Sequence, residues 1–343
     1  MTATTDPTPR LAAYGETARR AAADYLARTD ASPYLLEPAG DYLARSGKGL
    51  RPALCLATSE AFGGSSTAAL PSAAAIELLH TAMLVHDDVE DESELRRGSP
   101  TLHLRYGRAS AINAGDGLAV VALGALRDNQ ALFGSDLAGR VWSEFELMGR
   151  RTVEGQAREL GWQRDNVVDL GPEDYLDLIL QKTCWYTTLL PLRVGALVGS
   201  QGRADLSALT RFGFYLGAAF QIRDDVLNLV GSTEHYGKEV AGDLREGKRT
   251  LMLLHLLAAA APAERDRVVG LLALPQARRT SDQVADVLDL MRRHGSIEFA
   301  EEFGRGIARA AAASFEEAFG RLPDSSAKDF VRDLVPYMVR RDR

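Results

Sequence analysis

Two acidic segments contain the residue types best suited to chemistry, and each opens with an Asp-Asp pair that follows a long apolar stretch. Their acidic residues are Asp87, Asp88 and Asp91 in the first segment and Asp224 and Asp225 in the second. Residues four apart share a helix face, so each segment would concentrate carboxylates. Oxygen ligands without His or Cys suit Mg²⁺, which bridges protein carboxylates to substrate phosphates. One acidic run alone is usually solvated surface, but two of this kind favour a metal site.

Basic residues that could meet phosphate groups occur in three segments. They are Lys48 and Arg51 in SGKGLRP, Arg96 and Arg97 after the first acidic segment, and Lys238 and Lys248 in YGKEVAGDLREGKRT. Arg offers bidentate contacts to phosphate, and Lys offers a mobile point charge. The signatures of a P-loop, a serine hydrolase and a zinc protease are all missing from the sequence. The charged residues therefore favour Mg²⁺-assisted handling of a phosphate group.

Helices are the elements expected to position these residues. Apolar residues recur at helical spacing over 73–85, 209–230 and 330–339, while alternating strand patterns are nearly absent. Short segments rich in Gly, Ser, Asp or Pro separate the helical stretches, and none is long enough to be a linker between domains. We expect one all-α domain of roughly ten or more helices over residues 11–343, preceded by a disordered tail over residues 1–10.

Composition narrows the function classes. The 343 residues are 46% hydrophobic and 25% charged with a net charge of −7, which indicates a globular chain and disfavours a nucleic-acid binder. Two cysteines, Cys55 and Cys184, cannot form a disulfide scaffold, so a reducing cytoplasm is expected. The N-terminus lacks a secretory pattern, and no run approaches the ~18 apolar residues of a spanning helix. We therefore expect no integral membrane segment.

Five motifs together resemble the trans-isoprenyl diphosphate synthases of the polyprenyl synthetase family, and are most like those of bacterial geranylgeranyl diphosphate synthases. In chain order they are SGKGLRP, IELLHTAMLVHDDVEDESELRRGSPTLH, QKTCWYTT, FQIRDDVLN and GKEVAGDLREGKRT. The second includes a full Asp-Asp-x-x-Asp. The similarity extends from about Tyr42 to the C-terminal arginines. A single motif would be weak evidence, whereas five in the family's order are specific.

The resemblance implies a fold and a reaction. The fold would be a class I isoprenoid synthase helical bundle with a deep central cavity. The reaction would be Mg²⁺-dependent head-to-tail condensation of isopentenyl diphosphate with allylic diphosphates, with geranylgeranyl diphosphate (C20) as the favoured product. A homodimer with about three Mg²⁺ ions per site is typical of the family. Product lengths of C15 or of C25 and more remain open.

The same resemblance assigns roles to individual residues. Asp87, Asp91 and Asp224 would bind the metal ions, with Asp88 and Asp225 in support. Arg96, Lys182 and Lys238 would hold the allylic diphosphate, and Lys48, Arg51, His80 and Arg97 the diphosphate of isopentenyl diphosphate. Thr183 and Gln221 would flank the reacting carbons as catalytic residues, and Asp243 and Lys248 would organise a closing loop.

Chain length would depend on the floor of the cavity. The family places this floor at Ala82 and Met83, four to five residues before the first aspartate, with Leu79 one turn deeper. Neither floor residue is aromatic, which disfavours a stop at C15; ordinary core packing is the alternative interpretation of both.

Three positions depart from the family pattern. Ser46 replaces a glycine, Gly49 stands where a basic residue is common, and Asn228 ends the second acidic segment where Asp is commonest. We expect Ser46 to be tolerated, one isopentenyl contact to be lost at Gly49, and the outermost carboxylate contact to be weakened at Asn228.

Two other functions compete with this interpretation. A terpene cyclase on the same fold would need only one acidic cluster and no isopentenyl site, which Lys48, Arg51 and Arg97 disfavour. A non-catalytic regulatory subunit would be expected to lose the acidic residues that this chain retains in both clusters.

Overall fold

The computed structural model describes residues 6–45, 47–230 and 241–340, and almost all of its regular structure is helical. The elements are α1 (Thr8–Ala27), α2 (Pro33–Ala44), α3 (Leu50–Ala61), α4 (Ser66–Glu90), β1 (Leu95–Arg96), β2 (Ser99–Pro100), α5 (Leu102–Tyr106), α6 (Arg108–Arg164), α7 (Pro172–Ile179), η1 (Leu180–Leu189), α8 (Leu190–Gly199), α9 (Ser207–Val230), α11 (Gly242–Glu246), α12 (Leu251–Ala259), α13 (Pro262–Leu272), η2 (Gln276–Arg278), α14 (Ser281–Arg293), α15 (Ser296–Phe319) and α16 (Ser326–Arg340). The all-α prediction is confirmed. Over the described residues the only strands are the two-residue β1 and β2, which pair antiparallel.

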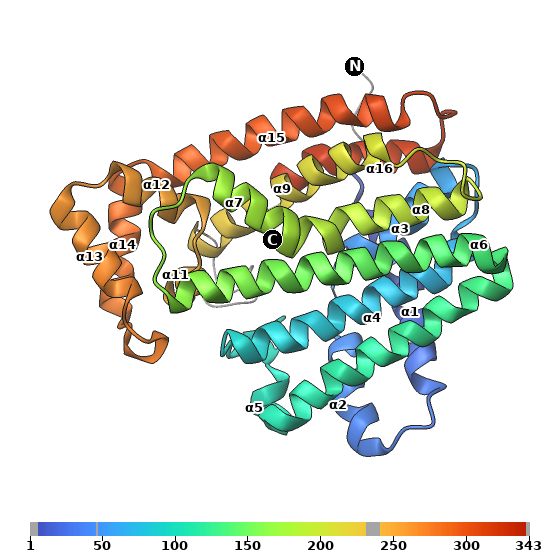
Figure 1. The fold of residues 1–343 in the computed structure, drawn as a ribbon, viewed down its shortest axis with the longest axis horizontal. Coiled ribbons are helices and arrows are strands. Elements are labelled where there is room, and N and C mark those ends of the chain that lie inside the picture. Colours follow the sequence, from blue (N-terminus) through green and yellow to red (C-terminus); the bar gives the residue numbers. More distant parts are fainter. Residues whose placement is uncertain (1–5, 46, 231–240, 341–343) are drawn as a thin grey trace.

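Helix α6 consists of two antiparallel arms. Gly134 breaks the helix with φ 79° and ψ 171°, a conformation that is strained for any residue with a side chain. Figure 1 shows the two arms turning back on each other at one end of the molecule, while α12–α14 lie at the opposite end. The second arm carries residues 135–164 past α4 and η1, and it forms one wall of the interior.

Helix α4 lies at the centre of the bundle. The hydroxyl of Ser65 caps its N-terminus by accepting a hydrogen bond from the amide of Ala68 at 3.1 Å. It packs against α1, α3, α6 and α8, and most of its residues are buried. Because α4 ends at Glu90, its C-terminal turn carries the first acidic segment to the end of the core.

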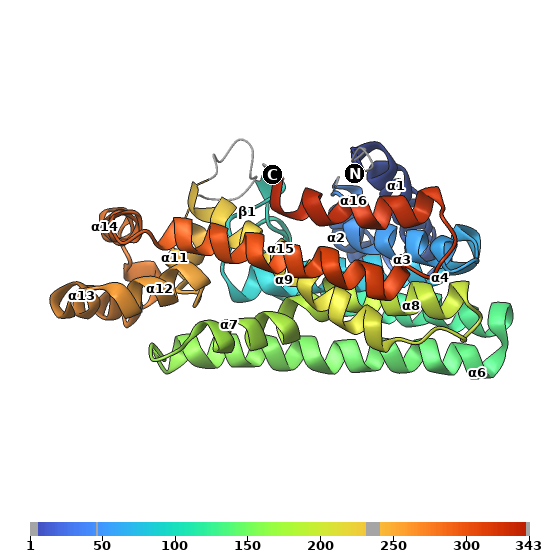
Figure 2. The ribbon, with the colours of Figure 1, turned by 90° about the horizontal axis from the view of Figure 1, so that it is seen from above.

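Helix α9 carries the second acidic segment in the same way. It packs against η1, α8, α15 and α16 and is buried along one face, as the apolar spacing over residues 209–230 predicts. Figure 2 shows α9 beneath α15, with α7 and α6 on the opposite side of the bundle. The ends of α4 and α9 therefore approach each other from different layers of the fold.

The expected tail over residues 1–10 is too long. Helix α1 already begins at Thr8, because Pro9 suits the first helical turn and Leu11 is buried in the core. Residues 1–5 lie outside the described part of the chain.

Two helices are long and apolar enough to cross a membrane by length and composition, namely α4 and α6. In α4, 67% of the apolar window is buried inside the protein, and in α6 the share is 44%. The burial of most of the α4 window is typical of a core helix of a globular protein. The absence of an integral membrane segment stays a prediction.

Candidate active site

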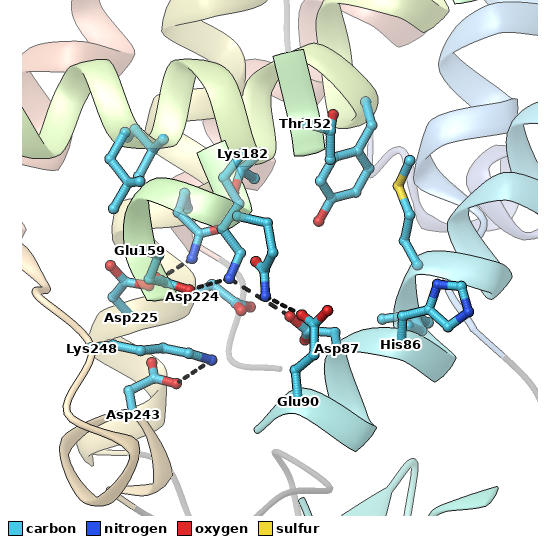
Figure 3. A pocket seen from close by; sticks show the side chains of 18 of the residues that line it. His86, Asp87, Glu90, Thr152, Glu159, Lys182, Asp224, Asp225, Asp243 and Lys248 are labelled. Carbon is cyan, nitrogen blue, oxygen red and sulfur yellow. Dashed lines mark hydrogen bonds and ion pairs between the residues drawn. The ribbon is translucent and has the colours of Figure 1, made fainter. Parts of the chain in front are cut away.

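A cavity of about 580 Å³ opens where α4, α6, η1 and α9 meet. Its polar lining includes Arg51, His80, Asp87, Arg96, Arg97, Glu159, Lys182, Gln221, Asp224, Asp225, Asp243 and Lys248. Figure 3 shows Asp87 on α4 across the cavity from Asp224 and Asp225 on α9, with the amines of Lys182 and Lys248 between them. Apolar side chains such as Leu84, Leu178 and Ile179 complete the walls. The two acidic segments, 137 residues apart from Asp87 to Asp224, thus face one cavity.

The structure places most of the predicted site residues on this cavity, including Thr183 and Met83. Asp88, Asp91, Lys48, Ala82 and Leu79 do not line it. Asp88 and Asp91 are buried beside it, Ala82 and Leu79 pack in the core, and Lys48 is exposed. Lys238 and Ser46 lie outside the described residues. Of the three residues expected to set chain length, Met83 therefore contacts the cavity and the other two do not.

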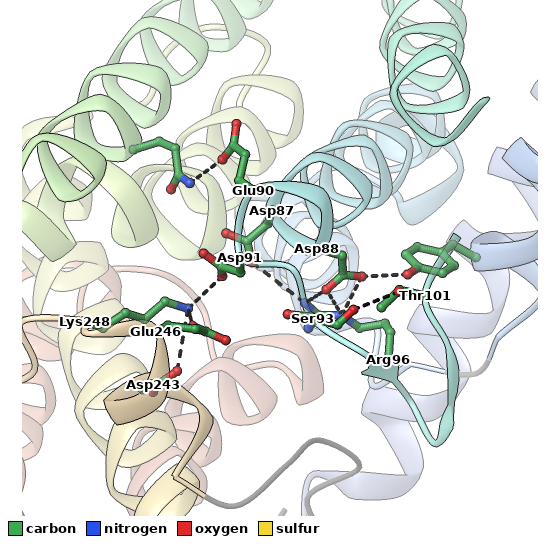
Figure 4. A network of polar contacts seen from close by, with 12 residues as sticks. Asp87, Asp88, Glu90, Asp91, Ser93, Arg96, Thr101, Asp243, Glu246 and Lys248 are labelled. Atoms are coloured by element: carbon green, nitrogen blue, oxygen red, sulfur yellow. Dashed lines mark hydrogen bonds and ion pairs between the residues drawn. The ribbon is translucent and has the colours of Figure 1, made fainter. Parts of the chain in front are cut away.

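The first acidic segment separates into residues with different surroundings. The carboxylate of Asp88 accepts hydrogen bonds from the hydroxyl of Tyr42 at 2.6 Å and from Nε of Arg96 at 3.0 Å, as Figure 4 shows. Burial opposes the charge of Arg96, but Asp88 more than offsets it and raises the pKa of that guanidinium. Asp87 instead lies at the cavity, 3.8 Å from Nη2 of Arg96.

Lys182 comes from η1, a π-helical segment, and such segments are common at functional sites. Its amine forms an ion pair with Glu159 and lies 3.6 Å from Oδ1 of Asp87. Gly155 makes this possible, because a Cβ there would lie 2.3 Å from the amide nitrogen of Lys182. Burial opposes the ammonium charge, but Glu159 and Asp87 outweigh burial and raise the pKa of Lys182. Lys182 is therefore a fixed cation at the cavity.

Lys248 is a second cation at the cavity that is held by carboxylates, as Lys182 is. Its amine lies 2.9 Å from Oδ2 of Asp91, 2.7 Å from Glu246 and 3.6 Å from Asp243. Burial raises the pKa of Asp91 to about 7, and the neighbouring carboxylate of Asp87 adds to the rise. The ammonium of Lys248 acts in the opposite direction but does not cancel the rise. A nearby divalent cation would favour the ionised form of Asp91.

Arg51, His80 and Arg97 form a second basic group on the same cavity. Nη1 of Arg51 lies 3.2 Å from Nε2 of His80, and its guanidinium stacks over the ring of Tyr186 at 4.6 Å. Burial and the charge of Arg51 lower the pKa of His80 well below its ordinary value, so its imidazole is neutral at pH 7. Arg97 donates to the carbonyl of Arg45 at 2.7 Å, which fixes it beside the turn before α3.

The departures at Gly49 and Asn228 have structural reasons. Gly49 has φ +62°, and a Cβ there would lie 2.4 Å from Cα of Gly15, so a basic residue would not fit. The side-chain oxygen of Asn228 accepts a hydrogen bond from the amide of Asp243 at 3.1 Å, and its carbonyl accepts one from Ala241 at 2.8 Å. Asn228 therefore anchors α11, and its amide oxygen is used there.

Several residues that contribute to the site could not be identified from the sequence. They are Tyr42, Gln156, Glu159, Tyr175 and Arg249. A buried acid on a helix, such as Glu159, looks like any surface carboxylate in sequence. The sequence held no signal for it, because the close approach of Gly155 to Lys182 is visible only in the fold.

The donors present fit a magnesium ion that a substrate helps to bind. Over residues 6–45, 47–230 and 241–340, no group of three His, Cys, Asp or Glu side chains could hold a metal by itself. Mg²⁺ is usually held by one or two carboxylates plus substrate phosphates. Asp87 and Asp224, with hard oxygen donors on opposite walls, meet that requirement.

Replacing Glu159 with Gln tests the buried ion pair at Lys182. We expect Glu159→Gln to lower the free energy of unfolding by about 3 kcal/mol, because it leaves a buried ammonium without its nearest counter-charge. Urea denaturation without metal measures this loss. Asp177→Asn is the matched control, since Asp177 pairs with the neighbouring Arg158 but is half-exposed, and the expected loss is at most about 1 kcal/mol. Equal losses in the two variants would contradict the assignment.

Comparison with known proteins gives consistent results. The polyprenyl synthetase family matches residues 32–291. The chain is 32% identical to a short chain isoprenyl diphosphate synthase of Methanothermobacter thermautotrophicus, over 92% of this chain and 93% of the relative. It is 31% identical to a geranylgeranyl diphosphate synthase of Saccharolobus solfataricus, over 89% and 90%.

Solved structures show the same similarity. Geranylgeranyl pyrophosphate synthetase from Pyrococcus horikoshii superposes with a TM-score of 0.85 and 31% identity, covering 98% of each chain. A polyprenyl synthase from Caulobacter crescentus, complexed with calcium and isoprenyl diphosphate, superposes with a TM-score of 0.84 and 27% identity over the whole of both chains. With its acidic segments on one cavity and its fold shared along the full length, this chain belongs to the polyprenyl synthetase family.

Proposed function

We propose that this protein is a prenyltransferase that condenses isopentenyl diphosphate head to tail with allylic diphosphates, with geranylgeranyl diphosphate (C20) as its main product. The observation that supports this most is the cavity on which two acidic segments and two basic groups converge. A terpene cyclase would leave the basic group of Arg51, His80 and Arg97 without a substrate to bind. A regulatory subunit would not need both acidic segments.

Asp87, Asp91 and Asp224 are the proposed metal-binding residues. Magnesium bound there would neutralise the leaving diphosphate of the allylic substrate. Support comes from the position of Asp87 and Asp224 at the cavity and from a structural relative that binds calcium and isoprenyl diphosphate. The number of ions, about three by family resemblance, is part of the proposal.

Two groups of cationic side chains would each bind the diphosphate of one substrate. Lys182, Lys248 and Arg96 flank the acidic residues and would hold the allylic diphosphate, with Lys238 expected to join them. Arg51, His80 and Arg97, together with Lys48, would hold the diphosphate of isopentenyl diphosphate. Neutral His80 would donate one ring N–H to a diphosphate oxygen and accept from Arg51 at the other nitrogen. The two basic groups thus separate the leaving diphosphate from the one that remains on the product.

Thr183 and Gln221 would face the reacting carbons between these groups. Their side-chain oxygens can stabilise the positive charge that develops as the carbon–oxygen bond breaks. Apolar walls, including Ile179, Phe220 and Tyr186, would exclude water that could quench the carbocation. The departing diphosphate can take the proton that is lost, so the chain needs no separate base.

The proposed reaction is tested by incubating the purified protein with Mg²⁺, isopentenyl diphosphate and C5, C10 or C15 allylic diphosphates. We expect pyrophosphate release that requires both substrates, and a C20 alcohol as the main product after dephosphorylation and chromatography. Asp87→Asn is expected to lower kcat by at least about 100-fold, because it removes a carboxylate from the metal site. A hydrocarbon formed from the allylic substrate alone would favour the cyclase, and a C25 product would correct the assigned length.

Met83 is the proposed chain-length residue, because it lines the cavity where Ala82 and Leu79 do not. Met83→Phe is expected to shift the main product to C15, since a ring at this position would block the growing chain. Leu79→Met conserves volume outside the cavity and should leave product length unchanged. Unchanged products in both variants would assign the floor of the cavity to other residues.

We also propose that the enzyme is a cytoplasmic homodimer that pairs through α6. Exposed apolar side chains recur at helical spacing on both arms, with Val120 and Leu123 on the first and Trp142 and Val153 on the second. A self-complementary surface of this kind suits two-fold pairing. The two cysteines are buried free thiols, which agrees with a reducing compartment.

The double variant Val120→Asp/Leu123→Asp tests the dimer. We expect light scattering after size exclusion to give a dimer for the native chain and a monomer for the variant, because buried carboxylates without partners would oppose pairing. Ala313→Asp is the control, since Ala313 is exposed on α15, which lies on the opposite side of the bundle from α6. A native monomer, or a variant that still dimerises, would rule out this interface.

A further inference from the structure

The two Asp-Asp pairs share an arrangement that their proposed metal-binding role does not explain. In each pair the first aspartate, Asp87 or Asp224, lines the cavity. The second aspartate, Asp88 or Asp225, is buried, with 1% and 5% of its surface exposed, and of these two only Asp225 also borders the cavity. Each buried carboxylate meets a tyrosine hydroxyl that comes from a different helix.

In the first pair a chain of contacts leads from α2 to the cavity. Tyr42, itself 2% exposed, donates its hydroxyl to Oδ2 of Asp88 at 2.6 Å and accepts a hydrogen bond from the amide of Leu102 at 3.3 Å. Nε of Arg96 contacts both oxygens of Asp88, at 3.0 and 3.1 Å. Nη2 of Arg96 also donates to Asp88, so three donors occupy this carboxylate and commit it to Tyr42 and Arg96. Its effect on the cavity passes through Arg96.

The backbone around Arg96 is held from the same side. Arg45, the residue directly after α2, donates hydrogen bonds to the carbonyl of Arg96 at 3.1 Å and to the carbonyl of Pro100 at 2.8 Å. Tyr42 therefore holds the side chain of Arg96 through Asp88, and Arg45 holds the main chain of Arg96 directly. An arginine held at both points meets a diphosphate in one geometry, which lowers the entropy lost on binding.

In the second pair a similar chain leads from α7. Tyr175 donates to Oδ2 of Asp225 at 2.7 Å, and Nε2 of Gln221 donates to Oδ1 of the same carboxylate at 2.6 Å. The amide nitrogen of Gln221 is the donor in this bond and therefore faces Asp225. The amide oxygen of Gln221 is then left for the cavity, where positive charge develops in the proposed reaction.

We propose that Tyr42 and Tyr175 are positioning residues that hold the second aspartate of each pair, so that Asp88 orients Arg96 and Asp225 orients the amide of Gln221. This inference rests on the proposed function of the site. It assigns the second aspartates to the orientation of neighbouring side chains, and it leaves metal binding to Asp87, Asp91 and Asp224.

The two tyrosines act on different stages of the reaction, which gives different kinetic signatures. Arg96 meets a diphosphate that is already charged in the ground state, whereas Gln221 meets charge that forms only in the transition state. Loss of a ground-state contact raises KM, and loss of a transition-state contact lowers kcat. A general loss of stability would not separate the two constants in this way.

The test compares Tyr42→Phe, Tyr175→Phe and the control Tyr25→Phe. Tyr25 makes the same type of bond, donating to Asp128 at 2.7 Å, but lies outside the active site. We expect Tyr42→Phe to raise KM for the allylic diphosphate about tenfold with kcat within twofold, and Tyr175→Phe to lower kcat about tenfold with little change in KM. Tyr25→Phe should match the native enzyme. If both active-site variants also match it, the proposal is wrong.

A binding measurement without turnover separates orientation from metal ligation. Calorimetric titration of inorganic pyrophosphate at several Mg²⁺ concentrations gives the Mg²⁺ requirement for binding. We expect Asp87→Asn to raise the Mg²⁺ concentration needed for pyrophosphate binding at least tenfold. Tyr42→Phe, Tyr175→Phe and Asp88→Asn should each leave that concentration within twofold of the native value. A raised requirement in Asp88→Asn would make Asp88 a metal ligand and overturn the proposal. Asp88→Asn also tests the first chain of contacts if Tyr42→Phe fails to fold, and thermal unfolding monitors that.

The same experiments distinguish failure of this inference from failure of the proposed function. If the native protein condenses no substrates, the proposed function fails and the kinetic comparison has no reference. If the native protein is active but the tyrosine variants behave like Tyr25→Phe, the reaction stands and only the positioning role is refuted.

Discussion

The balance of buried charge at the cavity is the constraint on which the rest of the structure depends. Two helices bring Asp87, Asp91 and Asp224 toward one space, where their mutual repulsion is poorly screened. Lys182 and Lys248 offset this charge through ion pairs with carboxylates on both sides. Apolar residues in these places would stabilise the fold at least as well, so the buried charges indicate a role other than stability.

The fold answers this constraint by fixing each charged group from behind. Gly155 lets α6 approach η1 closely enough for Glu159 to hold Lys182. Tyrosines from α2 and α7 hold Asp88 and Asp225, and Asn228 ties α11 to the end of α9. Side chains that are held in this way keep their geometry when a substrate arrives, so that binding energy is not spent on ordering them.

Much of the site could be predicted from the sequence because its chemistry is local. Asp87, Asp88 and Asp91 lie within five consecutive residues, and the basic residues lie in short motifs. Residue type and spacing therefore revealed the acidic and the basic residues of the site. The all-α fold followed from the helical spacing of apolar residues. Glu159, Tyr42 and Tyr175 could not be found in this way, since each acts on a residue 23 to 50 positions distant. The bend at Gly134 was missed for a related reason, because a lone glycine does not show whether a helix turns back.

The sequence by itself determined the helical class, the two acidic segments and the kind of ligand that they suit, because these depend on residue type and on the 3.6-residue helical repeat. Only the tertiary structure decided that Asp87, Asp224 and Asp225 line the cavity while Asp88 does not, and that Met83, rather than Ala82 or Leu79, contacts it. Adjacent residues on a helix point about 100° apart, and the neighbours available to each side chain come from distant segments. Spacing therefore identifies a cluster, and packing assigns the role of each member.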